Sequence, residues 1–308
     1  MQQFRSGAVN TVLASRAPST STVYSQAFRE FQLFAIAHKV SCLPAQPEHV
    51  LMFLEARRAQ GLSSTSLSNS LYGIAWMHNL MGFPSPSDHT LCRAFLEGAR
   101  RLAPPKQCKT IPATHCMLVA LHNAALQSGR LIDYRTFLIA LFSYAGCLRF
   151  AECSTLTFAD ITIHDKGIQL YLKQSKTDQH KLGNVVELAD TNTPLSPKSC
   201  FSSYLGLLGP GHSKPHSFVF ANIGSPRPVS RDNCVKLLRA LLKDDPSPHT
   251  QLLTMHSFRI GCATALLAKG LDSAHVRQLG RWRSDTSLDR YNRQSSALKL
   301  DISRLLDL

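Results

Sequence analysis

His256-Ser257-Phe258-Arg259 and Gly280-Arg281-Trp282, with Tyr291 nine residues after that tryptophan, form the stretch that most restricts the fold of this chain. His256 and Arg259 are three positions apart, a spacing that places both side chains on one face of a helix. Free backbone amides near the start of that helix favour an anion. One His/Arg pair at this spacing is common on protein surfaces, so its meaning depends on the rest of the sequence.

A second arginine lies upstream, inside Ala145-Gly146-Cys147-Leu148-Arg149-Phe150-Ala151-Glu152. The planar guanidinium group donates two parallel hydrogen bonds to phosphate oxygens and keeps its proton. Arg149 and Arg259 therefore predict a clamp on a phosphate group. Glu152, three residues after Arg149, is expected on the same helix face, where its carboxylate would orient an arginine or a histidine.

Cleavage of a phosphodiester without a metal also requires a nucleophile and a proton for the leaving oxygen. Tyr291 is the predicted nucleophile, because nearby arginines help a phenol to ionise. Trp282 offers an uncharged N–H donor for a phosphate oxygen, although a tryptophan after a helix usually packs in a core. Lys176 is the predicted general acid, with Lys173 and Lys181 as rivals at comparable distance.

Taken together, these residues resemble the tyrosine recombinase (phage integrase) family. That family has an arginine followed three residues later by an acidic group, a hairpin lysine, a His-x-x-Arg box, a Gly-His or Gly-Trp position and a tyrosine nine residues on. The phrases Ser175-Lys176-Thr177-Asp178 and Leu279-Gly280-Arg281-Trp282-Arg283-Ser284-Asp285 are closest in style to recombinases of eukaryotic mobile elements of the DIRS and Crypton kinds.

The resemblance implies a site-specific recombinase or integrase that cleaves and rejoins duplex DNA through a covalent 3′-phosphotyrosine, with no metal and no cofactor. Four protomers would assemble on two DNA sites and exchange strands through a Holliday junction. Arg281, Arg283 and Lys173 are predicted to contact DNA, although Arg281 is equally compatible with a solvated charge. Residues 295–308 would pack as a helix either on a neighbouring protomer or on their own core.

Hydrophobic periodicity predicts a mainly α fold with a small antiparallel β-sheet, in two domains. Residues 19–103 are expected to form a helical domain resembling the family's core-binding (SAM-like) domain. The basic, proline-bearing residues 104–111 are expected to be a linker, residues 112–308 the catalytic domain, and residues 1–18 a disordered or truncated start. The expected helices cover residues 23–37, 49–55, 66–80, 88–101, 113–128, 131–145, 197–208, 231–242, 257–269, 272–279 and 285–292. The hydroxyl residues at 19–22 and 63–65 are expected to cap the helices that begin at 23 and 66. Gly270 is expected to end the helix over 257–269 in a left-handed conformation, and Gly280 to end the helix over 272–279. The expected strands cover residues 161–163, 168–172 and 185–188.

Composition agrees with a polyanionic partner. Lysine and arginine number 34 against 20 acidic residues, which gives a formal net charge of +14. The nine cysteines contain no C-x-x-C pair, so neither a disulfide framework nor a zinc ribbon is indicated. No apolar run long enough for a membrane span and no secretory signal are seen, which predicts an intracellular protein. Together with the resemblance, this predicts a location where the DNA is, which is the nucleus if the source is a eukaryote.

Two other functions share much of this pattern. A type IB topoisomerase uses similar residues to nick and reseal one strand, and a domesticated DNA-binding protein would keep the clamp without cutting. The presence of Tyr291 argues against the silent binder, which has no need of it. A metal-dependent transposase is disfavoured because no H-E-x-x-H or comparable ligand spacing occurs.

Overall fold

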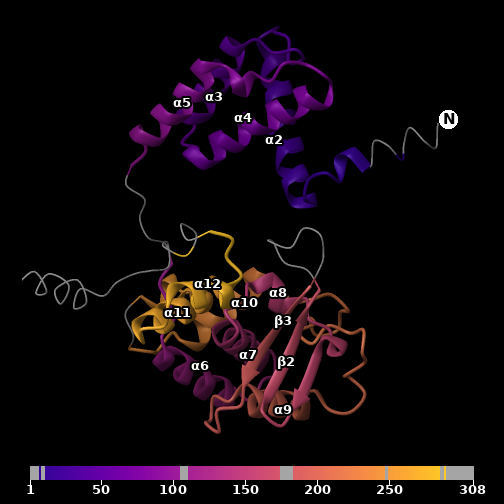
Figure 1. The fold of residues 1–308 in the computed structure, drawn as a ribbon, viewed down its shortest axis with the longest axis vertical. Helices are drawn as coiled ribbons and strands as arrows, with labels where there is room; N and C mark the ends of the chain where they lie inside the picture. The colour runs from indigo at the N-terminus through magenta and orange to yellow at the C-terminus, as the bar shows by residue number, and fades with distance from the viewer. Residues whose placement is uncertain are drawn as a thin grey trace, which may run out of the picture. The chain divides into compact units, whose positions relative to one another are not determined.

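The computed structural model describes residues 7, 11–104, 110–173, 183–246, 249–284 and 288. The chain divides into two compact units, one ending at Gln107 and the other beginning at Cys108. Figure 1 draws the helices and strands of both units, and each unit has its own hydrophobic core. None of the helices in these described ranges is long and apolar enough to cross a membrane.

The first unit is built from four described α-helices: α2 (Pro18–Ala37), α3 (Pro47–Ala59), α4 (Ser64–Leu80) and α5 (Thr90–Leu102). Helices α2 and α4 approach closely at Gly73, where an added Cβ would lie 2.8 Å from both the Ala27 Cβ and the Tyr24 carbonyl oxygen. The Ser63 hydroxyl accepts a hydrogen bond from the Ser66 amide and caps α4 as predicted. The predicted cap of α2 at residues 19–22 is wrong, because the helix already begins at Pro18, whose fixed φ suits a first helical position.

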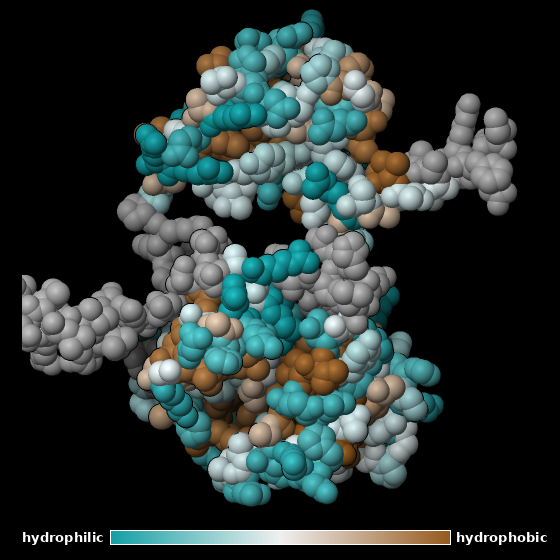
Figure 2. Space-filling view, in the orientation of Figure 1, coloured by the Kyte–Doolittle hydropathy of each residue, from teal (hydrophilic) through white to brown (hydrophobic). Residues whose placement is uncertain are grey.

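Apolar side chains fill the space between these four helices. The core consists of Phe28, Phe31, Val50, Phe53, Leu54, Leu67, Leu71, Ile74, Cys92, Leu96 and Ala99. Several apolar residues stay on the surface, including Leu33 and Ile36 of α2, which are 64% and 73% exposed. The space-filling view accordingly shows brown, hydrophobic residues among teal, hydrophilic ones on the visible face (Figure 2).

The second unit is arranged around α7 (Leu131–Ala145), in which every residue from Asp133 to Ser143 is buried. Packed against it are α6 (His115–Ser128), α8 (Phe150–Ser154), α9 (Pro197–Leu208), α10 (Arg231–Leu241) and α11 (Met255–Ala268). Helix α12 (Ser273–Gly280) follows α11 and contacts it. A helix was expected at Arg149 and Glu152 without stated ends, and α8 begins one residue after Arg149. The helix predicted over residues 285–292 lies outside the described residues apart from Leu288.

Three strands form an antiparallel sheet in the order β1 (Ile161–His164), β2 (Gly167–Leu172), β3 (Asn184–Ala189). The register pairs Ile161 with Leu170 and Leu170 with Val186. Alternate residues of β2 and β3 are buried, as expected for a sheet with one face on a core, and α9 packs on both strands. The predicted fold class, mainly α with a small antiparallel sheet, is confirmed.

Candidate active site

Arg149 lies in the short turn that joins α7 to α8. It has extended backbone angles (φ −78°, ψ 149°) and precedes the first residue of α8, so the prediction that it shares a helix face with Glu152 is wrong. Glu152 instead lies in the first turn of α8, where its Oε2 accepts from the Arg149 amide at 2.8 Å. Its Oε1 accepts from the Arg149 guanidinium at 2.5 Å. The carboxylate thus fixes both the backbone and the side chain of Arg149.

The two partners of the Arg149–Glu152 ion pair differ in their exposure to solvent. The Arg149 side chain is 20% exposed, whereas that of Glu152 is 2% exposed. Burial raises the pKa of the Glu152 carboxyl, but the Arg281 charge and the hydrogen bonds from Arg149 outweigh it, so the pKa lies below its ordinary range. Glu152 is therefore ionised at neutral pH. It holds Arg149 while part of the Arg149 side chain stays accessible to solvent.

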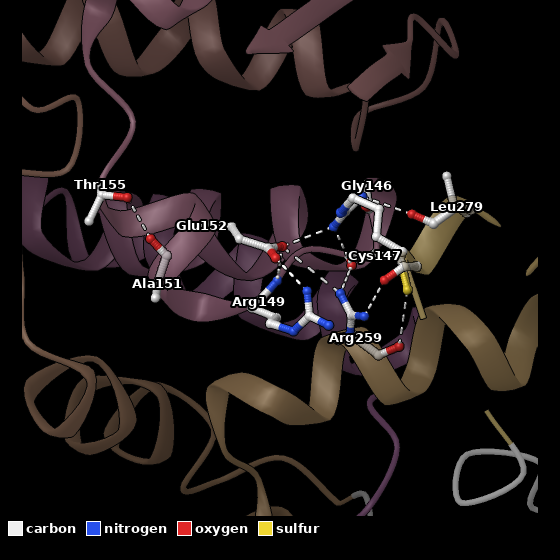
Figure 3. Close-up of polar contacts among 10 residues, drawn as sticks. Gly146, Cys147, Arg149, Ala151, Glu152, Thr155, Arg259 and Leu279 are labelled. Atoms are coloured by element: carbon white, nitrogen blue, oxygen red, sulfur yellow. Dashed lines mark hydrogen bonds and ion pairs between the residues drawn. The ribbon is translucent and has the colours of Figure 1, made fainter. Parts of the chain in front are cut away.

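Arg259 comes from the first part of α11 and reaches the same place (Figure 3). Its guanidinium donates to the backbone carbonyls of Cys147 and Gly280, and lies 4.0 Å from Glu152. The side chain is 1% exposed, and burial lowers its pKa to about 10, so it stays protonated at neutral pH. In this structure Arg259 is covered, so Arg149 is the guanidinium of this pair that a ligand reaches directly.

Trp282 covers Arg259 from one side. The guanidinium carbon of Arg259 lies 4.3 Å from the centre of the indole ring, in cation–π geometry. The ring is 9% exposed and packs with Cys147, Cys262, Ala263 and Val276, which is the core packing that a tryptophan at such a place usually has. Trp282 therefore supports the charge of Arg259 from a buried position.

His256 occupies the first turn of α11, three residues before Arg259, as its spacing predicts. The residue is exposed, yet its pKa is lowered to about 4 by partial burial of the ring and by the charges of Arg259 and Arg149. The charges of Arg259 and Arg149 are the stronger reason for the lowered pKa of His256, because water still reaches the residue and limits the effect of burial. His256 is thus a neutral imidazole at neutral pH, able to accept or donate one hydrogen bond.

Three basic residues were predicted to contact DNA, and they differ in their surroundings. Lys173 donates to the buried Asp160 at 2.8 Å, with a side chain that is 56% exposed. Arg283 is exposed and lines an open pocket with Arg277 and His275. The third, Arg281, points inwards: it binds Glu152 at 2.9 Å and its side chain is 10% exposed. The expectation that Arg281 reaches DNA or is solvated therefore does not describe this structure.

Lys176, Lys181 and Tyr291, together with residues 295–308, lie outside the described residues. The structure brings together the other predicted site residues from three separate parts of the second unit: Arg149 and Glu152 from α8 and its preceding turn, His256 and Arg259 from α11, and Trp282 after α12. Among the described residues, no group of three or more His, Cys, Asp or Glu side chains is placed to hold a metal ion.

The charges at the site do not cancel. Three guanidinium groups, those of Arg149, Arg259 and Arg281, surround the single carboxylate of Glu152. Two positive charges among these four side chains remain to attract an anion, and partial burial strengthens their field. Preorganised charge of this kind stabilises negative charge that grows on phosphate oxygens during reaction.

The backbone part of this site was not predicted from the sequence. The Cys147 carbonyl accepts hydrogen bonds from both Arg259 and Arg281, and Cys147 has a positive φ of 49°. Gly146 beside it leaves no room for a side chain, since an added Cβ would lie 2.9 Å from Leu188. The Ala-Gly-Cys sequence before Arg149 was the available signal, because a glycine at the end of a helix marks a turn.

Comparison with known proteins agrees with this geometry. A model of the phage integrase family matches residues 117–297. An integrase/recombinase xerD homolog from Selenomonas ruminantium is 23% identical over 291 residues, which cover 92% of this chain and 84% of that protein. The recombinase cre of Escherichia phage P1 is 22% identical over 282 residues, covering 86% of this chain and 80% of that protein.

Among solved structures, the XerH site-specific recombinase bound to palindromic difH substrate, in a post-cleavage complex, has the same fold. It aligns with a TM-score of 0.63 at 13% identity, covering 94% of this chain and 78% of that one.

Proposed function

The chain belongs to the phage integrase family, and from this premise we propose that it is a site-specific DNA recombinase. It is an enzyme that cleaves and rejoins DNA strands through a covalent 3′-phosphotyrosine intermediate. The observation that carries this function is the convergence of Arg149, Arg259 and His256, from segments about a hundred residues apart, on one electropositive site. The relatives named above, a xerD homolog and cre, carry the names of recombinases.

In the proposed reaction the Tyr291 hydroxyl attacks the scissile phosphorus, and the 5′ oxygen of the next nucleotide leaves. Arg149 donates to the phosphate oxygens from its partly exposed side. Arg259 adds its buried charge behind Arg149, and a direct contact from Arg259 would require its carbonyl hydrogen bonds to rearrange. The phenol proton of Tyr291 passes to neutral His256 or to water, and His256 can also donate a hydrogen bond to the reacting oxygens.

The departing 5′ oxygen takes its proton from a lysine near the β2–β3 connection. We propose Lys176 for this role, with Lys181 as the alternative. Lys173 is less suited, because its ammonium group already pairs with the buried Asp160 and would leave that carboxylate without its charged partner.

Duplex DNA is the proposed substrate and partner. We propose that residues 19–103 act as the core-binding domain and residues 112–308 as the catalytic domain, with 104–111 as the linker. Assembly of four protomers on two DNA sites, through residues 295–308, is a further proposal. A location with DNA inside the cell, and in the nucleus if the source is a eukaryote, stays a prediction.

The test is a nicked suicide duplex, which traps the covalent intermediate because a short leaving strand diffuses away. With a library of random or genomic duplexes as substrate, the wild-type chain is expected to give a protein–DNA adduct on a denaturing gel. Tyr291→Phe should bind the same DNA with nearly unchanged affinity and give no adduct, since it lacks only the nucleophilic oxygen. An adduct that persists in this variant would overturn the assignment of Tyr291.

The same substrates distinguish the alternatives. Recovery of a junction from two cognate duplexes indicates strand exchange. Adduct formation with relaxation of supercoiled DNA, but without a junction, would instead favour topoisomerase-like nicking and resealing. Specific binding by a folded wild-type chain that never forms an adduct would favour the silent binding protein.

A further inference from the structure

Arg281 is the residue whose position differs most from the sequence-based expectation. It directly follows α12 and takes the left-handed conformation (φ 55°, ψ 42°), with its amide bonded back to the Gln278 carbonyl. A residue with a Cβ is disfavoured in this conformation, so other interactions must stabilise it here. Strained backbone of this kind persists where surrounding contacts over-determine it, and it gathers at functional sites.

The side chain of Arg281 supplies those contacts. Its Nη1 donates to the Leu279 carbonyl at 2.8 Å, and its Nη2 donates to the Cys147 carbonyl at 3.1 Å and to Glu152 Oε2 at 2.9 Å. One guanidinium group therefore joins the end of α12 to the turn before α8 and to the first turn of α8. The fork of an arginine makes this possible, whereas the single ammonium of a lysine does not.

Two of the acceptors of Arg281 also hold another arginine of the active site. Glu152 binds the amide and guanidinium of Arg149, and the Cys147 carbonyl accepts from Arg259. Arg259 in turn binds the carbonyl of Gly280, the residue before Arg281. The three arginines thus share acceptors, and Arg281 hydrogen-bonds to Glu152 as well as to carbonyls of both backbone segments.

We propose that Arg281 is a positioning residue for strand cleavage: it holds Glu152 and the Cys147 carbonyl so that Arg149 and Arg259 are fixed around the scissile phosphate, and it does not itself contact DNA. This inference rests on the proposed function. It assigns to Arg281 a task distinct from the phosphate contact that its charge and place in the sequence suggest.

A consequence for pH follows from the charges around Glu152. The groups that face this carboxyl are the guanidinium groups of Arg149, Arg259 and Arg281, with the thiols of Cys147 and Cys153 nearby. Burial raises the pKa of Glu152, and the Arg281 charge is the largest influence that lowers it. Without Arg281 the pKa of Glu152 should rise, so the carboxyl would take up a proton at a higher pH and release Arg149.

The test compares Arg281→Met with Arg231→Met in the full chain, on the nicked suicide duplex. Arg231 is a matched control because it lies at the start of α10 with a side chain 70% exposed, so its loss removes one positive charge outside the site. At saturating DNA, Arg281→Met should slow adduct formation by about 10–100-fold, the range typical for residues that orient a reacting group. Its affinity for DNA should equal that of Arg231→Met, and the acid limb of its pH–rate profile should move to higher pH.

Coupling to Glu152 separates positioning from a general loss of structure. In a Glu152→Gln background, Arg281→Met should add little further loss, because the two residues act as one unit. Arg281→Lys keeps the charge but lacks the fork, so it should retain most of the wild-type pH profile with an intermediate rate. This variant also serves if Arg281→Met does not fold.

The opposite outcome would identify a phosphate contact. If Arg281→Met binds DNA more weakly than Arg231→Met, with a shallower salt dependence, but reacts at the wild-type rate once saturated, the proposal fails. Independent losses from Glu152→Gln and Arg281→Met with an unmoved pH profile would overturn it as well.

Titration of the Glu152 carboxyl by ¹³C NMR needs no activity. It should show a raised pKa in Arg281→Met even if the wild type forms no adduct, so failure of the proposed function and failure of this inference are distinguishable.

Discussion

At the scale of single residues, the pKa of His256 measures the effect of the positive charges at the site. Its ring lies beside two guanidinium groups that oppose protonation, and its pKa is lowered to about 4. We expect the NMR titration of its ring carbons to have a midpoint well below the ordinary value of about 6.5. Arg149→Met should raise that midpoint, because it removes one of the two like charges. A wild-type midpoint at the ordinary value would contradict the charge cluster described here.

The lowered pKa of His256 also makes the stability of the folded chain depend on pH. The unfolded chain takes up a proton on His256 near pH 6.5, whereas the folded chain does so only near pH 4. Between these values the unfolded state binds more protons, so His256 contributes a loss of stability as the pH falls through this window. Above pH 6.5 both states are neutral at this residue and the contribution disappears.

Spacing along the sequence singled out several residues that the structure brings together, but it did not give the direction in which each side chain points. His256 and Arg259 could be paired because three positions on a helix define a shared face. Arg259 and Arg281 turn inwards because they bind the backbone carbonyls of Cys147, Leu279 and Gly280. Carbonyl acceptors exist at every residue, so no side-chain pattern marks them in advance.

At the scale of elements, the end of α12 depends on two adjacent residues with different tasks. The sequence predicted that Gly280 would stop this helix, yet Gly280 belongs to the helix and Arg281 takes the left-handed conformation. Gly280 is required for another reason: a Cβ there would overlap the ring of Trp282. The predicted left-handed stop at Gly270, with φ 80°, is confirmed.

We therefore expect Gly280→Ala to displace Trp282 from Arg259. Overpacking of this kind costs about 1–3 kcal/mol of unfolding free energy. Gly206→Ala in α9 is the control, because Gly206 is exposed with nothing within 4 Å of an added Cβ, and alanine there should stabilise by about 0.5–1 kcal/mol. Urea unfolding measures both. Equal stability of the two variants would show that the close contact between Gly280 and Trp282 is wrong.

Regular elements were predictable where their periodicity is long enough. Strands β2 and β3 alternate in burial, and the helix over residues 197–208 has the predicted ends. The ends of helix α8 could not be predicted because it has five residues, fewer than two turns, so no repeat of apolar positions can develop. The Glu152 carboxylate, which is bonded to the Arg149 amide, stabilises its start.

At the scale of the whole molecule, charge is spread over both units. Up to residue 107 the basic residues exceed the acidic ones by 10 − 5 = 5, and beyond it by 24 − 15 = 9. Each unit has a separate hydrophobic core, so each is expected to fold without the other. If both bind one duplex, the linker makes the second contact intramolecular and raises its effective concentration.

We therefore expect the full chain to bind duplex DNA more tightly than residues 108–308 alone, with a steeper dependence on salt. Each phosphate contact adds about 0.9 to the slope of log affinity against log salt concentration on duplex DNA, so contacts from the first unit add to those of the second. Fluorescence anisotropy at several salt concentrations measures both quantities, with circular dichroism of each fragment as the control for folding. Residues 1–107 added as a separate chain should restore little of the affinity, because the effective concentration is lost. Equal slopes for the full chain and for residues 108–308 would mean that the first unit does not hold DNA, and its proposed role as a core-binding domain would fail.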